Sequence, residues 1–192
     1  MKFASLIYVA IILSVSVFSC KKWTDPHSPS DPRIDGRKYC NDPDAVNFNW
    51  GFPGTPDSTT CIYPSDIFSG SYVFVDSIYD LNDILDTLNS KTSYTLNVYS
   101  INKNKFAVLG FCGPNDSLKF TAERTSFRAL ADSNIKINDS TLGYGQLFCR
   151  MVDTVSGFFT KSQTDSTHQI RINLKVVSDT GINFHRGTAY KQ

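Results

Sequence analysis

Few side chains in this sequence could carry out chemistry. The candidates for a nucleophile, a base or an acid after residue 100 are His168, His185, Cys112, Cys149 and Glu123. Nucleophilic catalysis needs a nucleophile, a base and an orienting acid that converge, and no local spacing brings three such groups together. His168 follows the turn-like QTDS and His185 precedes Arg186, so both are expected at the surface. We therefore expect a protein that is not an enzyme and needs no cofactor.

A further cysteine, Cys20, lies where an apolar run gives way to a polar one. Residues 1–3 form a short basic start and residues 4–18 are uncharged and apolar. This is the layout of a secretory signal peptide covering residues 1–19. As a helix the run would span roughly 24 Å, less than the roughly 30 Å hydrocarbon core, so an uncleaved anchor is the weaker interpretation. The other alternative is an ordinary signal peptide that happens to contain a cysteine.

Ser19 directly before Cys20, with Val17 two residues earlier, resembles the lipobox of bacterial lipoproteins. The resemblance implies cleavage before Cys20 and acyl chains on its sulfur and new amino group. Because each buried methylene contributes about 0.8 kcal/mol, two or more chains would hold the protein at a bilayer. The implied location is the cell envelope, at the outer membrane. Lys21 and Lys22 lack the acidic cluster that often marks surface-exported members of this family. Which face of the membrane the protein occupies is therefore left open.

The charge balance excludes electrostatically driven partners. Residues 1–19 contain one charged side chain, Lys2. Without them the chain has 18 basic and 18 acidic side chains. A neutral chain has no electrostatic reason to bind nucleic acid. Of the acids, 17 are aspartate and one is Glu123. Because aspartate favours turns and glutamate favours helices, this skew indicates short strands joined by tight turns.

Proline divides the exported chain into an irregular part and a regular part. Seven of the eight prolines lie between Pro26 and Pro64, which leaves the remainder free to form strands whose ladders need every backbone N–H. Residues 20–39 have too few apolar side chains to fold alone and are predicted to form a flexible tether. Residues 40–64 form a separate loop motif, and residues 67–192 are predicted to form one β-domain.

With Cys20 acylated, four cysteines remain, an even number that favours disulfides in an exported chain. Of the three pairings, Cys40 with Cys61 is preferred because the two flank one turn-rich loop. Closing about 22 residues contributes roughly 3 kcal/mol. Cys112 and Cys149 could then pair, bind a metal with the histidines, or remain buried thiols. A disulfide is preferred, because no pair of ligands has the close spacing of a zinc site.

The loop motif has its own resemblance. CNDPDAVNF from Cys40, ending in CIY from Cys61, is similar to a short cysteine-bounded motif of Bacteroidetes lipoproteins, and this supports the compartment rather than a function. Oxygen donors for calcium are abundant in it. They are Asn41, Asp42, Asp44, Asn47, Asn49 and Asp57. The EF-hand spacing is absent, and Asx beside Pro and Gly is ordinary turn chemistry, so the turn interpretation is preferred over a calcium site.

Alternation of apolar and polar residues recurs throughout the β-domain. In THQIRINLKVVSD, Ile170, Ile172 and Leu174 share one face of a half-buried antiparallel strand. Similar runs begin at Ser71, Ser93, Lys105, Ser117, Ser126, Thr141, Thr154 and Ile182. Turn-like segments such as NKNK and GPND separate them. The expected fold is all-β, an antiparallel up-and-down barrel or sandwich of about eight or nine strands.

One segment has the spacing of a helix. DLNDILDTLN places Leu81, Ile84, Leu85 and Leu88 at helical intervals after Asp80, a plausible N-cap. We expect a short helix here that covers one end of the barrel.

The strand rhythm and the start Phe68-Ser-Gly-Ser-Tyr72 resemble lipocalin-like barrels, which implies a cavity for a small apolar ligand. The alternative, which we prefer, is a solid core, because side chains usually fill small barrels. The core would then hold Phe106, Phe111, Phe120, Phe127, Phe148, Phe158 and Phe159.

Saccharide binding is a second alternative, since exposed aromatic rings serve as platforms for sugars. Trp23 and Trp50 lie outside the β-domain, and alternation places Tyr99 or Tyr144 in the core as easily as on the surface.

Asp-Ser and Asp-Thr pairs followed by an apolar residue or Thr resemble the acceptor tripeptide for O-glycosylation in exported Bacteroidetes proteins. The hydroxyls concerned are Ser58, Ser77, Thr87, Ser117, Ser140, Thr154 and Ser166. Turns that lead into strands commonly have the same sequence, so the pattern has a purely structural explanation as well. We expect an envelope lipoprotein that acts as a non-catalytic binding or structural module, with an apolar small molecule, a glycan or an envelope protein as partner.

Overall fold

The computed structural model describes residues 36–90, 93–113, 116–133, 145–149, 153–162 and 168–192. All of the described residues except Gly36 belong to one compact unit, Arg37–Gln192. The predicted signal peptide, Cys20 and almost all of the predicted tether lie outside the described residues. Within the described residues, no helix has the length and apolar character needed to cross a membrane.

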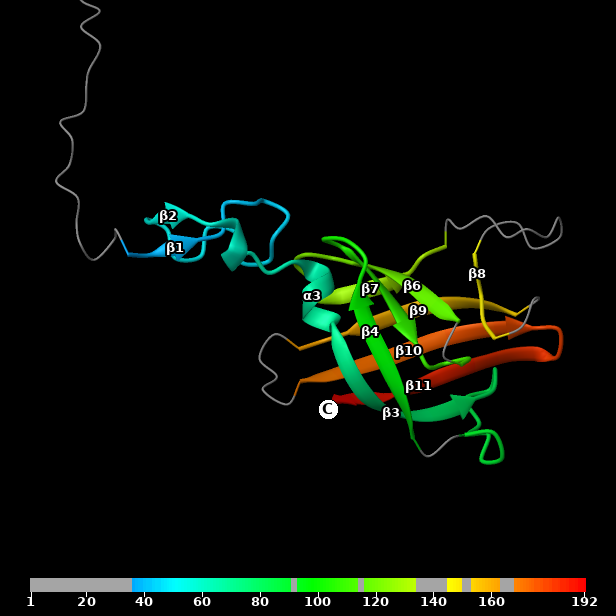
Figure 1. Cartoon of the computed structure of the whole chain (residues 1–192). Helices are drawn as coiled ribbons and strands as arrows, with labels where there is room; N and C mark the ends of the chain where they lie inside the picture. Colours follow the sequence, from blue (N-terminus) through cyan, green and yellow to red (C-terminus); the bar gives the residue numbers. More distant parts are fainter. Residues whose placement is uncertain (1–35, 91–92, 114–115, 134–144, 150–152, 163–167) are drawn as a thin grey trace, which may run out of the picture. The chain divides into compact units, whose positions relative to one another are not determined.

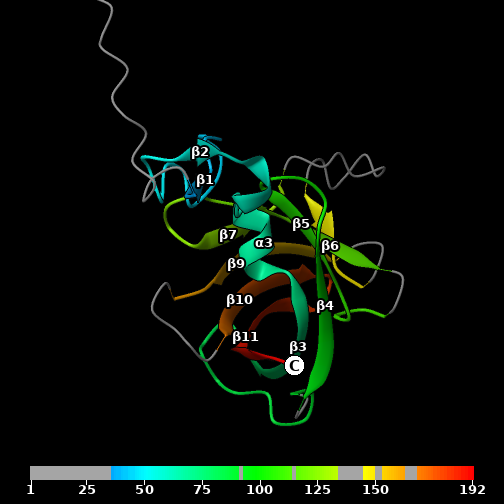
Figure 2. The same cartoon turned by 60° about the vertical axis from the view of Figure 1, so that its left-hand side comes forward.

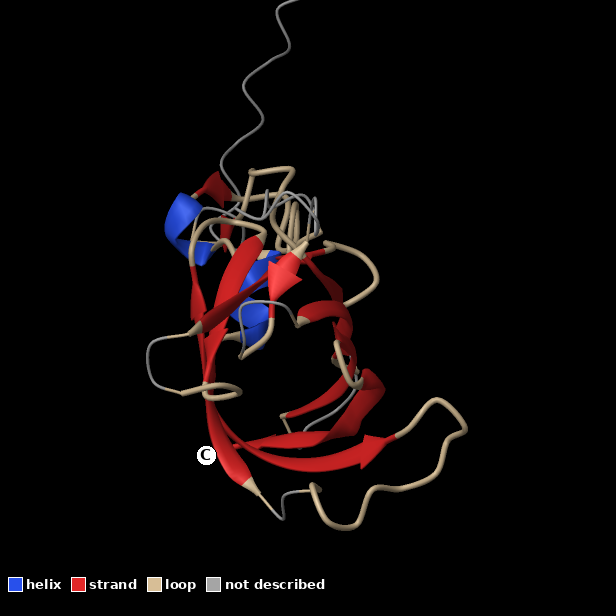
Figure 3. Ribbon diagram, turned by 90° about the vertical axis from the view of Figure 1, so that its right-hand side faces the viewer, coloured by secondary structure: helices blue, strands red, loops and turns tan. Residues whose placement is uncertain are grey.

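The unit is built on an eight-stranded antiparallel barrel (Figure 1). Its strands are β3 (Gly70–Tyr79), β4 (Tyr94–Ser100), β5 (Lys105–Leu109), β6 (Ser117–Ala122), β7 (Arg128–Ala131), β9 (Thr154–Thr160), β10 (Gln169–Ser178) and β11 (Gly181–Lys191). Each pairs with the next, and β11 pairs with β3 to close the ring seen in Figure 3. A ninth strand, β8 (Gln146–Leu147), pairs with β9. The predicted all-β meander is confirmed, and it closes as a barrel rather than a sandwich.

Alternation within the strands fills the barrel. On β10 the buried residues are Ile170, Ile172, Leu174 and Val176, as the sequence pattern predicts. A stack of rings occupies the interior: the ring centroid of Phe120 lies 5.4 Å from that of Phe106 and 4.4 Å from that of Phe159. Such close aromatic contacts fill space at the density of a protein core.

Five of the seven phenylalanines expected in the core are buried, and two are not. Phe127 lies in the turn between β6 and β7 with a φ of 51°. Phe158 is on the outer face of β9, where the Arg128 guanidinium carbon lies 4.1 Å from its ring centroid. The expectation for these two was wrong, because adjacent residues of a strand point to opposite faces, and Phe159 takes the inward position.

A short helix, α3 (Pro64–Phe68), lies against one end of the barrel (Figure 2). Proline suits its first turn, and the backbone N–H of Tyr63 is bound by the Asp66 carboxylate at 3.0 Å. The Ser65 hydroxyl donates to the carbonyl of Asn102 at 2.7 Å, which ties the helix to the β4–β5 turn. Phe68 is fully buried, with its ring centroid 5.1 Å from that of Phe106. The helix thus seals this end.

The helix predicted at DLNDILDTLN does not form. The Asp80 carboxylate accepts from the backbone N–H groups of Asn82 and Ile84, and Asp86 does the same for Leu88 and Asn89. These bonds replace the helical ladder by turns, which is the usual competition from aspartate. The apolar residues Leu81, Ile84, Leu85 and Leu88 are exposed. Helical spacing alone does not make a helix when no surface is present to cover its apolar face.

A small disulfide-bonded module precedes α3. It consists of β1 (Lys38–Tyr39), β2 (Thr55–Pro56) and the 3-10 turn η1 (Ser58–Thr60). Cys40 is bonded to Cys61, as predicted. The Asn47 amide links the two arms of the loop, donating to the Thr60 carbonyl at 2.7 Å and accepting from the Ile62 N–H at 2.8 Å. The second predicted disulfide, Cys112–Cys149, is also present.

Candidate functional site

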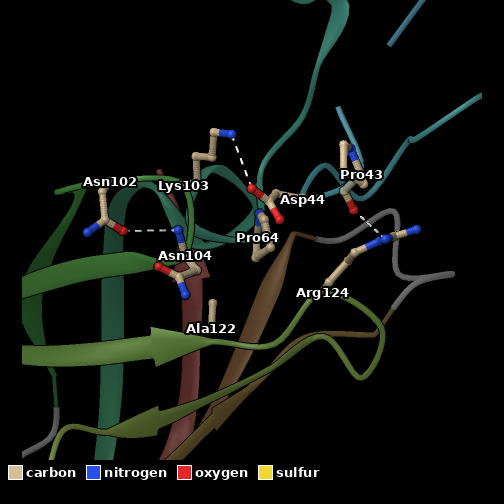
Figure 4. Close-up of a pocket in the computed structure, with 8 residues that line it drawn as sticks. All are labelled: Pro43, Asp44, Pro64, Asn102, Lys103, Asn104, Ala122 and Arg124. Carbon is tan, nitrogen blue, oxygen red and sulfur yellow. Dashed lines mark hydrogen bonds and ion pairs between the residues drawn. The ribbon is translucent and has the colours of Figure 1, made fainter. Parts of the chain in front are cut away.

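A pocket of about 490 Å³ lies where the disulfide module approaches the α3 end of the barrel (Figure 4). We call it the junction pocket. The β4–β5 turn, the segment after β6, the module and the first residue of α3 supply its lining. The lining residues are Pro43, Asp44, Pro64, Asn102, Lys103, Asn104, Ala122 and Arg124.

Lys103 joins the barrel to the module. Its Nζ lies 2.6 Å from Asp42 Oδ2 and 3.2 Å from Asp44 Oδ2. The Tyr63 hydroxyl also donates to Asp42, at 2.9 Å. The hydrogen bond from Lys103, followed by those from the Asp44 N–H and Tyr63, lowers the pKa of Asp42 to about 2. The same two carboxylates raise the pKa of Lys103 above its usual range. Lys103, which lines the pocket, therefore stays charged at every ordinary pH.

Arg124 forms the opposite wall. Its Nη1 donates to the carbonyl of Pro43, and its guanidinium carbon lies 5.6 Å from the Phe48 ring centroid. A guanidinium carries five N–H donors, and this bond uses one of them. Arg124 thus fixes the module against the barrel while it presents further donors at the pocket.

The two asparagines belong to the tight β4–β5 turn. Asn102 Oδ1 accepts from the backbone N–H groups of Asn104 and Lys105, at 3.1 and 2.9 Å. The Ile101 N–H donates to the Lys105 carbonyl at 2.8 Å, which closes the turn. The pocket therefore presents amide, carboxylate, ammonium and guanidinium groups on a rigid frame. This set suits hydrogen bonding to a polar ligand rather than proton transfer.

The carboxylates considered for calcium do not gather around one point. Asp42 and Asp44 face Lys103, whereas Asp57 lies 2.8 Å from Lys38 Nζ and caps η1 through the Thr59 N–H. The bond from Lys38, with those from Thr59, holds the pKa of Asp57 well below its usual range. Over the described part of the chain, no group of three or more His, Cys, Asp or Glu residues could hold a metal ion.

One histidine lies where it was expected and the other does not. His168 is exposed, immediately before β10. The expectation for His185 was wrong: only 13% of its side chain is exposed, and Nδ1 lies 2.8 Å from Asp76 Oδ2 inside the barrel. The Tyr94 hydroxyl donates to the same oxygen at 3.1 Å. Burial, with the nearby Asp76 charge, raises the pKa of Tyr94 well above its usual range.

The alternation could have located this polar group. Tyr72, Phe74 and Asp76 occupy every second position of β3, and all three are buried. On β11, His185 shares a face with Ala189, which is also buried. If the alternation of each strand had been applied to its polar residues as well, it would have placed both Asp76 and His185 in the interior.

Exposed aromatic rings that could serve a saccharide lie on the module. Trp50 is 67% exposed and Phe52 65% exposed, and the Phe52 ring makes an edge contact with Tyr39 at 5.5 Å. On the barrel, Tyr99 is on the exposed face of β4. Trp23 and Tyr144 lie outside the described residues.

The candidate glycosylation sites fall in different settings. Ser58 and Thr87 are exposed in turns, and Ser117 and Thr154 are the first residues of β6 and β9. Ser77 lies within β3 and is half-buried, and the neighbouring Asp76 is buried. Ser140 and Ser166 lie outside the described residues.

Comparison with known proteins gives no match: no family model, no curated protein and no solved structure is significantly similar to this chain.

Proposed function

We propose that this chain is a lipid-anchored protein of the cell envelope and that its barrel is a rigid, non-catalytic binding module. The lipobox-like residues before Cys20 support the anchor. Two disulfides fit an oxidising compartment outside the cytoplasm. The observation that carries the binding role is the junction pocket, in which fixed polar groups of the module and the barrel surround about 490 Å³.

The ligand class follows from the lining of the pocket. Lys103 and Arg124 supply two positive charges to the lining and Asp44 one negative charge. Asp42, outside the lining, is ion-paired with Lys103 at 2.6 Å, so little net charge is left to select an ion. Asparagine, aspartate and arginine side chains match the hydroxyl groups of a polyol. A saccharide, or a glycosylated envelope component, therefore fits this pocket better than an apolar molecule does.

The carrier of a small apolar ligand is the second candidate. The closed eight-stranded meander supports it, since barrels of this size hold one small ligand when they are hollow. The stacked rings of Phe106, Phe120 and Phe159, with Phe68 below them, argue against a cavity in the α3 half.

The anchor is tested in the native cell. We expect the protein extracted from membranes to begin at Cys20 with acyl chains attached, and Cys20→Ser to release it into the soluble fraction. Mass spectrometry of the N-terminal peptide measures the first residue and its acyl chains, and the amount of protein in the soluble fraction measures the release of Cys20→Ser. A native protein that starts at Met1, or an unmodified Cys20, would refute the anchor.

The binding role is tested by site-specific photo-cross-linking in living cells. A photoreactive side chain at Asn104, which is exposed at the junction pocket, should capture a glycan or glycosylated partner. The same side chain at Leu88, which is 93% exposed on the β3–β4 loop, is the matched control. Equal capture at the two positions would contradict a binding role for the pocket.

A further inference from the structure

Asp76 and His185 lie inside the barrel, in its half away from α3. On β3 the chain runs from Gly70, close to α3, through the buried Tyr72 and Phe74 to Asp76. Asp76 is paired in register with Gly187 of β11, and His185 with Ile78 of β3. This polar pair shares no residue with the junction pocket.

The Asp76 carboxylate is only half satisfied. Oδ2 accepts from the Tyr94 hydroxyl at 3.1 Å and lies 2.8 Å from His185 Nδ1. Oδ1 is buried, and among the described residues no group hydrogen-bonds to it. Asp76 as a whole is 3% exposed. A buried acceptor without a donor is costly, so its retention points to a donor that comes from outside the chain.

The two rings that contact this carboxylate, those of Tyr94 and His185, pack against three phenylalanine rings. We call the rings of Phe74, Tyr94, Phe111, Phe148 and His185 the ring cluster. The Tyr94 centroid lies 5.5 Å from that of Phe74 and 6.0 Å from that of Phe111. The Phe148 centroid lies 6.0 Å from that of Phe111 and 5.2 Å from that of His185.

The Cys112–Cys149 disulfide holds two members of the ring cluster together. Cys112 follows Phe111 and Cys149 follows Phe148, so the bond fixes two segments that are distant in sequence beside one another. Phe111 and Phe148 are each only 7% exposed, so both rings belong to the buried core.

The chemistry of these groups selects one class of ligand. An anion would be repelled by Asp76, and a neutral apolar molecule would leave Oδ1 unpaired. A neutral O–H or N–H donor would pair with Oδ1 but would lack the charge that both the carboxylate and the aromatic faces attract. A divalent metal needs more ligands than the described residues gather here. A small organic cation satisfies both features, because aromatic faces attract ammonium groups and an N–H can donate to the carboxylate.

We propose that Asp76 and the ring cluster bind a small alkylammonium ion, with its N–H on Asp76 Oδ1 and its alkyl groups against the rings. Entry requires the Phe148 ring to turn away from His185, because their centroids lie only 5.2 Å apart. Phe148 follows the two-residue strand β8 and its N–H is bound to the Asp153 carbonyl at 2.8 Å, so the ring can turn while the backbone stays in place.

The test is an NMR titration of the intact exported chain with trimethylammonium chloride. Saturable shifts of the Phe148 and His185 ring signals are expected. Tetramethylammonium, which has no N–H, should bind at least fivefold more weakly, and tert-butanol, a neutral molecule of similar size, should give no saturation. Asp76→Asn should weaken trimethylammonium binding at least tenfold, whereas Asp83→Asn, which removes the same charge from an exposed position, should leave it unchanged.

Equal binding by Asp76→Asn and the wild type would overturn the proposal, as would the absence of saturation up to 100-fold molar excess over a millimolar protein sample. Should Asp76→Asn fail to fold, Phe148→Ala replaces it, and a loss of less than threefold would then count against the site. A crystal soaked with trimethylammonium that shows only an ordered water on Oδ1 would likewise reject it. The junction pocket is unaffected by any of these results.

Discussion

Two adjacent phenylalanines of β9 test the barrel most directly, since one faces the interior and the other faces out. Phe159 is fully buried, and its ring centroid lies 4.4 Å from that of Phe120 and 6.0 Å from that of Phe106. Truncation to alanine leaves a cavity that the closed barrel cannot collapse, so Phe159→Ala should lower the free energy of unfolding by about 3–5 kcal/mol. Phe158 is only partly buried, beneath Arg128. Phe158→Ala should cost about 1 kcal/mol, mostly from the lost cation–π contact and partial burial.

Urea denaturation followed by circular dichroism measures both variants. The midpoints should differ while the slope m stays constant, because the surface exposed on unfolding is nearly the same. The expected gap of about 2 kcal/mol or more is a large fraction of the about 5–15 kcal/mol that stabilises an ordinary domain. Equal losses, or a larger loss for Phe158→Ala, would place the strand one residue out of register. A loss below about 1.5 kcal/mol for Phe159→Ala would mean a hollow interior and would favour the apolar carrier.

Further predictions concern the module, its acid sensitivity and a glycine of the barrel. Replacing both Cys40 and Cys61 by serine should lower the free energy of unfolding by about 3 kcal/mol, as seen by thermal denaturation, because a closed loop of 22 residues is released in the unfolded chain. The pKa of Asp42 is lowered to about 2 from 3.8. Its contribution to stability is therefore present above about pH 4 and is lost as the pH falls towards 2. Protection of the module amides against hydrogen exchange should fall over that window in the wild type, and less so in Lys103→Gln, which keeps the bonds to Asp42 from the Asp44 N–H and Tyr63. Gly157→Ala should cost more than about 1 kcal/mol by urea denaturation, since φ is 134° and the new Cβ would lie 2.2 Å from the Asn173 carbonyl oxygen; an unchanged midpoint would contradict this geometry.

The strands could be predicted because each depends on a local pattern. In β10, four apolar residues at every second position face the core, and no other secondary structure places them together. The disulfides were predictable for a similar reason, since setting Cys20 aside leaves four cysteines, which allow only three pairings. Barrel closure was not predictable in this way, because the pairing of β11 with β3 joins residues more than 100 positions apart.

The wrongly predicted helix has a different physical cause, which is that local spacing does not reveal what covers a side chain. Leu81 and Leu88 have helical spacing, yet no element packs on them, and Asp80 and Asp86 bind the backbone N–H groups that a helix would use. The actual helix, Pro64–Phe68, is only five residues long and forms because Phe68 enters the end of the barrel. Its N-terminal proline and the nearby Asp66 are a start signal for a helix. In so short a helix, such a signal rarely decides whether the helix forms.

The two candidate sites make separable claims about the same barrel. At the α3 end, stacked phenylalanines and Phe68 fill the interior, so a ligand there must bind outside, in the polar junction pocket. In the other half, the interior holds a half-satisfied carboxylate within aromatic rings, so a ligand there must be a cation that enters. Since the filled half separates them, capture at Asn104 should not respond to Asp76→Asn. A cross-link at Asn104 that trimethylammonium abolished would show that the two ends are coupled, and the division of the barrel into a solid and an accessible half would then be wrong.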